Sequence, residues 1–73
     1  MSSLYACIIR TADDDILTDI IVSDNWLKVV EEMSNNTEEG IEEVHMCAIA
    51  TVEDEPTTAQ RNEAIRWIAR HLV

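Results

Sequence analysis

The sequence Leu4–Thr11, LYACIIRT, is apolar at nearly every position and contains paired isoleucines. The run is too short for a typical helix, and it therefore predicts a strand that is buried on both faces. Because a central strand is covered more completely than its neighbours, we expect this one to lie in the middle of a sheet.

Two further runs predict the partner strands. Ile16–Val22 (ILTDIIV) follows the first run after the polar break at residues 12–15, and this arrangement predicts a β-hairpin. Gly40 introduces Ile41–Val52 (IEEVHMCAIATV), whose residues alternate in character. In an unbroken strand, one face of this run would carry Val44, Met46, Ala48, Ala50 and Val52, and the other Glu43, His45, Cys47, Ile49 and Thr51.

A first helix is predicted after the hairpin, capped by Ser23 or Asp24. Its apolar residues recur at steps of three and four, which is the spacing of one helix face. This stripe comprises Trp26, Val29, Val30 and Met33, and Trp26 is accordingly expected in the core.

A second helix is predicted from a capping box of Thr57 and Gln60 to about Leu72. Its expected apolar stripe comprises Ala64, Ile65, Ile68, Ala69 and Leu72. Trp67 lies outside that stripe. With Arg66 and Arg70 it is typical of an exposed interface anchor, but it would equally suit a residue that covers a sheet edge or stacks on Arg70.

The order of these elements predicts an α+β fold of the ββαβα type in one small domain, residues 1–73. A right-handed crossover through the first helix places the third strand beside the first, giving an antiparallel sheet of order 2-1-3. We expect both helices to pack on one face of this sheet.

The charge is strongly negative, with 15 acidic residues against five Lys and Arg and a net charge of −10. Such a surface repels nucleic acid and anionic membranes and attracts basic partners. The longest uncharged stretch, Val44–Val52, is shorter than the roughly 20 residues that span a bilayer. We therefore expect a soluble, cytoplasmic protein that does not bind nucleic acid directly.

The predicted topology brings two acidic segments to one end of the sheet. The expected cluster comprises Asp13, Asp14, Asp15, Glu38, Glu39, Glu42 and Glu43, and Asp24, Glu53, Asp54 and Glu55 would gather at the opposite end. Carboxylates in such an array can imitate phosphates and occupy a basic groove. They can also serve only to keep a small domain soluble.

Motifs for catalysis are absent: the chain has no GxSxG sequence, glycine-rich phosphate loop or HExxH sequence. We expect no enzyme and no cofactor. A metal site of Cys7, His45 and Cys47 lacks the close ligand pairs of structural zinc, and the Asp13–Asp15 run lacks the glycine of a calcium loop.

In size and charge, though in no aligned motif, the chain resembles phage-encoded inhibitors such as anti-CRISPR proteins and DNA mimics. This resemblance implies an inhibitor whose acidic cluster blocks a basic protein or nucleic-acid-binding complex. The alternative is a small adaptor or homodimer that uses Trp67, Arg66 and Arg70, or an open sheet edge.

Overall fold

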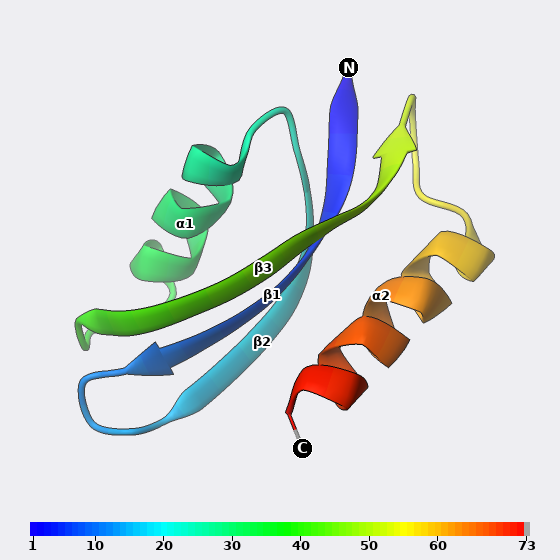
Figure 1. Ribbon diagram of the computed structural model, residues 1–73. Coiled ribbons are helices and arrows are strands. Elements are labelled where there is room, and N and C mark those ends of the chain that lie inside the picture. The colour runs from blue at the N-terminus through cyan, green and yellow to red at the C-terminus, as the bar shows by residue number, and fades with distance from the viewer. Residues whose placement is uncertain (73) are drawn as a thin grey trace.

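The computed structural model describes residues 1–72 and consists of a three-stranded sheet with two helices (Figure 1). The predicted element order is confirmed. The elements are β1 (Ser2–Thr11), β2 (Ile16–Ser23), α1 (Trp26–Asn35), β3 (Ile41–Val52) and α2 (Thr58–His71).

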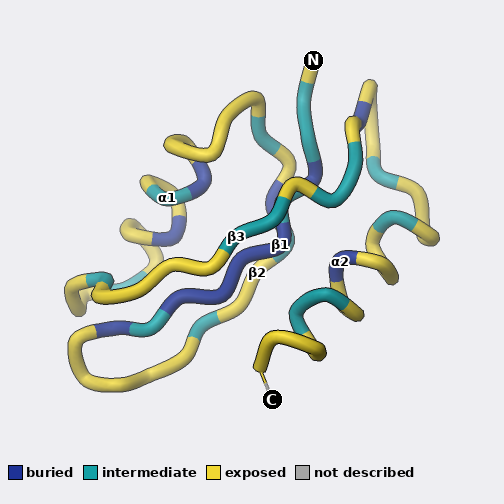
Figure 2. Tube along the Cα trace, in the orientation of Figure 1, coloured by how far each residue is buried: buried dark blue, intermediate teal, exposed yellow. Residues whose placement is uncertain are grey.

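Strand β1 lies between β2 and β3 and is antiparallel to both, which confirms the predicted order. Leu4, Cys7 and Ile9 are almost completely buried in it. Figure 2 shows the longest buried stretch of the chain on this strand. The apolar run that predicted a central strand is therefore the core of the protein.

The two helices lie on opposite faces of the sheet, which corrects the expectation that both pack on one face (Figure 1). Cys7 and Ile9 pack with Val29 of α1, whereas Leu4 and Ala6 pack with Ala64 of α2. Successive residues of a strand point to opposite faces. Because β1 is apolar at successive positions, each face needs its own cover.

A bulge in β3 moves its later side chains to the other face of the sheet. Tyr5 pairs with Ala48 and Leu4 pairs with Ala50, so Ile49 is an extra residue in β3. Met46, before the bulge, packs on the α1 side, and Val52, after it, packs on the α2 side. The expectation that these residues share one face is therefore wrong.

Helix α1 is capped by Asn25, and not by Ser23 or Asp24. The Asn25 side chain accepts a hydrogen bond from the Lys28 N–H at 3.0 Å. The Ser23 hydroxyl instead donates to the Asn25 carbonyl at 3.1 Å. Trp26 follows the cap and is 61% exposed, so the prediction that it belongs to the core is wrong.

Helix α2 begins with the predicted capping box. The Gln60 N–H donates to Thr57 Oγ1 at 3.1 Å, and the Thr57 N–H donates to Gln60 Oε1 at 2.9 Å. The buried stripe is rotated from the predicted one: Ala64 is buried and Trp67 is half-buried, whereas Ile65 is 53% exposed. Leu72 is also exposed.

Candidate functional site

The hairpin turn between β1 and β2 is joined to the start of β3. The Ala12 N–H donates to the Gly40 carbonyl at 2.8 Å, and Thr11 pairs with Ile41. This junction brings the two predicted acidic segments to one end of the sheet, which we call the acidic end. Its carboxylates, all exposed, are Asp13, Asp14, Asp15, Glu38, Glu39, Glu42 and Glu43.

Arg10, which the sequence analysis did not place in this cluster, holds three of its carboxylates. The guanidinium lies 3.1 Å from Asp14, 2.9 Å from Glu42 and 3.3 Å from Glu43. These hydrogen bonds raise the pKa of Arg10, the one to Glu43 most. In return, Arg10 holds the pKa of Glu43 below its ordinary value. The signal in the sequence was a lone arginine near the end of an otherwise apolar strand.

Thr11 fixes the conformation of the hairpin turn. Its buried hydroxyl donates to the Asp13 carboxylate, and this hydrogen bond is the main cause that lowers the pKa of Asp13. The same hydroxyl oxygen accepts from the Asp15 N–H at 3.2 Å. Asp14 has a φ of 66°, a left-handed conformation that Asp tolerates better than most residues. The three turn aspartates are thus carried on an ordered backbone.

The second acidic group lies at the opposite end of the sheet, as the topology predicted. Ser3 pairs with Ser23 and Ser2 pairs with Val52, so the segments that follow β2 and β3 start from the same end. The group consists of Asp24, Glu53, Asp54 and Glu55. Asp24 lies 2.9 Å from the Lys28 ammonium, whose hydrogen bond lowers the pKa of Asp24.

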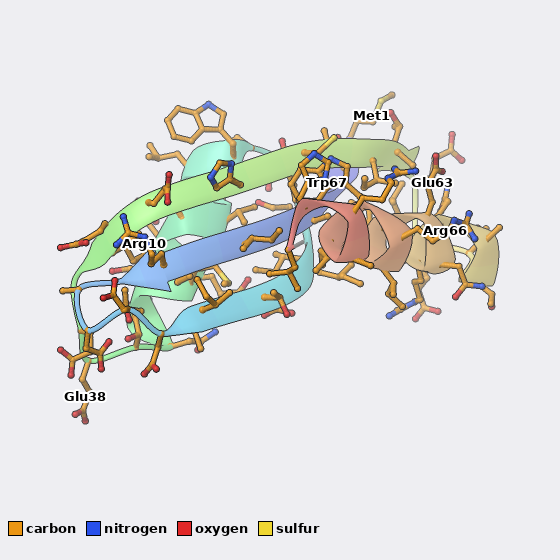
Figure 3. All side chains as sticks on the ribbon, turned by 60° about the horizontal axis from the view of Figure 1, so that its bottom comes forward. Met1, Arg10, Glu38, Glu63, Arg66 and Trp67 are labelled. Carbon is orange, nitrogen blue, oxygen red and sulfur yellow. The ribbon has the colours of Figure 1, made fainter. Side chains whose placement is uncertain are left out.

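Trp67 is not an exposed anchor but packs against the core cluster of Leu4, Ala6, Val52 and Ala64. Its indole stacks on His71, with ring centroids 4.2 Å apart, and not on Arg70. Arg66 and Arg70 are exposed on the same helix. In Figure 3, Trp67 and Arg66 lie away from the end that carries Arg10 and Glu38, so the predicted site residues form two separate surfaces.

The three residues considered as metal ligands are divided by the sheet. Cys7 is buried on the face that α1 covers, whereas His45 pairs with Ile8 and Cys47 with Ala6 on the other face. Burial raises the pKa of Cys7 to about 11, with smaller contributions from Asp19 and Glu32. Within residues 1–72, no group of three His, Cys, Asp or Glu side chains is arranged to hold a metal ion.

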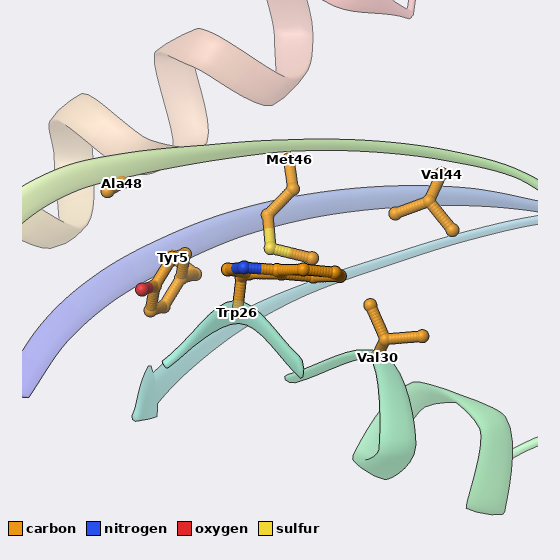
Figure 4. A pocket seen from close by; sticks show the side chains of 6 residues that line it. All are labelled: Tyr5, Trp26, Val30, Val44, Met46 and Ala48. Atoms are coloured by element: carbon orange, nitrogen blue, oxygen red, sulfur yellow. The ribbon is translucent and has the colours of Figure 1, made fainter. Parts of the chain in front are cut away.

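An apolar groove of about 500 Å³ lies between α1 and β3, a feature that the sequence analysis missed. Trp26 stands at its centre, and the Met46 side chain points toward the indole ring (Figure 4). Its lining residues are Tyr5, Trp26, Val30, Val44, Met46 and Ala48. The groove could have been predicted from Val44 and Met46, because these apolar residues lie on a strand that the predicted order placed at the edge of the sheet.

Comparisons of this chain with protein-family models, curated proteins and solved structures find no match. Neither helix described in residues 1–72 has the length and apolar character needed to cross a membrane. The geometry of the acidic end and of the groove is therefore the basis of the functional proposals.

Proposed function

We propose that the protein is a non-catalytic inhibitor whose acidic end occupies the nucleic-acid-binding surface of a basic partner. In this respect it would act as phage-encoded anti-CRISPR proteins and DNA mimics do. The observation that carries the proposal is the 2.8 Å hydrogen bond from Ala12 to Gly40, because it joins two acidic segments that are distant in sequence. The result is seven exposed carboxylates at one end of the protein.

Electrostatics supports this role. A protein that binds nucleic acid gains much of its affinity from contacts between its Lys and Arg side chains and phosphates. Glu38 and Glu39 form no ion pair within residues 1–72, and both are exposed to such a partner. Arg10 holds Glu42 and Glu43 in place, which reduces the conformational freedom that they would lose on binding.

Displacement from immobilised DNA tests the proposal. DNA-binding proteins of a bacterial lysate are loaded on DNA-cellulose, and the column is developed with the purified protein at low salt. We expect the protein to release specific DNA-binding proteins, identified by mass spectrometry, and rising salt to weaken this release. A variant with Glu38, Glu39, Glu42 and Glu43 changed to Gln should release far less.

The matched control carries the same change in charge at the other end. It has Asp24→Asn, Glu53→Gln, Asp54→Asn and Glu55→Gln, and we expect it to release the same proteins as the unaltered chain. Equal loss in both variants would show that only net charge matters and would overturn the assignment of the site. Release of no DNA-binding protein by the unaltered chain would overturn the function itself.

The alternative of self-association through α2 has less support. Trp67, the anchor of that hypothesis, is half-buried against Leu4 and Val52 and stacks on His71. Its indole therefore serves the packing of α2 on the sheet and offers a partner only part of its surface.

A further inference from the structure

The groove between α1 and β3 exists because α1 does not extend over the whole sheet. The core contacts of α1 are made by Val29 and Met33, which pack with Cys7 and Ile9 of β1 and with Ile21 of β2. The side of β3 that faces α1 is left largely open, and Val44 and Ala48 are exposed there. An exposed indole and these side chains together form an apolar surface beside a strand.

Strand β3 is also an edge of the sheet. It pairs with β1 on one side, and alternate N–H and C=O groups along its other side are open to a further strand. The other edge, β2, is bordered on the α1 side by a hollow with charged walls, including Asp24, Lys28 and Glu32. The hollow on the α2 side of β2 also has charged residues in its lining, Asp19 and Arg61. At β3, by contrast, the open backbone edge adjoins a groove lined without Asp, Glu, Lys or Arg.

The charge of the protein determines which kind of segment this edge would attract. No Lys or Arg lines the groove in the described chain, and β3 begins in the acidic end, at Ile41. A second copy of the chain would bring another net charge of −10 to this edge and would be repelled. A basic segment would be attracted, and its positive side chains would lie near Glu42 and Glu43.

We propose that the edge of β3 and the groove bind an extended basic segment of a partner, which adds to the sheet as a fourth strand. Main-chain hydrogen bonds to β3 would supply affinity, and alternate apolar side chains would seat between Trp26, Val30 and Met46. The inference rests on the proposed function in one respect, since both take the partner to be basic.

A synthetic peptide tests this surface. The probe is a fluorescein-labelled peptide of about eight residues in which Val and Lys alternate, with blocked ends. Its anisotropy is measured with the unaltered protein, with Trp26→Ala and with Leu27→Ala. Leu27, 53% exposed on the same helix, does not line the groove and is the matched control. We expect Trp26→Ala to weaken binding about tenfold or more and Leu27→Ala less than about twofold.

Three further peptides separate strand addition from simple charge attraction. Two carry N-methyl groups, one on every Val and the other on every Lys; both keep the charge, and one of them loses the backbone donors that face β3. We expect that one to bind about tenfold more weakly or worse. The third replaces Lys with Glu and should not bind. Undiminished binding of both N-methylated peptides, or equal affinities of the Trp26→Ala and Leu27→Ala variants, would overturn the proposal.

Analytical ultracentrifugation of the protein alone tests whether a second copy of the chain occupies the groove instead. A dimer that forms at physiological salt, where the repulsion between two copies is screened, and that is lost in Trp26→Ala would show that a second copy fills the groove. It would overturn the proposal of a basic segment. The variant with four Gln at the acidic end separates the two proposals. If this variant displaces DNA-binding proteins as well as the unaltered chain does, the proposed function is wrong. If peptide binding in the same experiments still depends on Trp26, the proposal for the groove is kept.

Discussion

Arg10 Nη1 lies 2.9 Å from a carboxylate oxygen of Glu42, and this pair joins the end of β1 to the start of β3. The same nitrogen lies 3.1 Å from Asp14 in the hairpin turn. One cation therefore connects both acidic segments of the acidic end. Without it, carboxylates of the same sign would face each other across the junction that the Ala12 to Gly40 hydrogen bond forms.

Arg10→Gln should lower the stability of the protein, because it removes the attraction that offsets repulsion among these carboxylates. The loss should be largest at low salt and shrink as salt screens the charges. The midpoint of urea unfolding, measured by circular dichroism at two salt concentrations, gives the difference. Lys28→Gln is the control for charge, since Lys28 pairs only with Asp24 within residues 1–72, and its effect should be smaller. Equal losses of stability in the two variants would show that the ion pairs of Arg10 contribute no more than that of Lys28.

Acidification should destabilise the protein through Glu43 and Asp13. Hydrogen bonds from Arg10 and from Thr11 lower the pKa of these two carboxyl groups in the folded state. Their stabilising contribution is therefore complete above the pKa values of these groups in the unfolded state, about 4. It is lost as the pH falls through their lower pKa values in the folded state.

Urea midpoints measured from about pH 6 down to about pH 3 test this dependence. Glu43→Gln should show a shallower decrease than the unaltered protein, because it removes the carboxylate that Arg10 binds. Glu39→Gln, which removes an exposed carboxylate of the same end, is the control for the change in net charge. A midpoint that rises on acidification would mean that relief of carboxylate repulsion outweighs the ion pairs.

Thr57→Ala should destabilise the protein by about 1 kcal/mol, because it removes the side-chain acceptor of the Gln60 N–H at the start of α2. Thr58→Ala, one residue further, removes no capping contact and should have a much smaller effect. Urea unfolding followed by circular dichroism measures both. Similar losses in the two variants would show that the capping box contributes little.

The sequence predicted the features that local patterns determine. The apolar run at Leu4–Thr11 located the central strand, and the Thr57 and Gln60 pair located the start of α2. The strand order then followed from one crossover and brought the two acidic segments to the same end. These features depend on hydrogen bonding and burial of residues near in sequence, together with a general rule of chain topology.

The features that the sequence did not predict depend on contacts between distant elements. The burial of β1 on both faces indicated two covering layers, yet the helices were expected on a single face. The extra residue at Ile49 could not be seen in the alternation of Ile41–Val52, because a bulge is defined by the pairing of two strands. Arg10 gained its role only when Asp14 and Glu42 were placed beside it in space.

The two tryptophans should differ in fluorescence. Trp26, which the sequence pattern placed in the core, should be the more exposed of the two, and Trp67 the more protected. Trp67→Phe leaves only Trp26, which is 61% exposed and should emit at long wavelength with strong quenching by acrylamide. Trp26→Phe leaves only Trp67, which packs on the core and on His71 and should emit at shorter wavelength with weak quenching. Acrylamide is neutral, so the negative charge of the protein does not bias the comparison. Quenching of Trp26 as weak as that of Trp67 would mean that the groove closes over Trp26 in solution, and it would contradict the open surface on which strand addition depends.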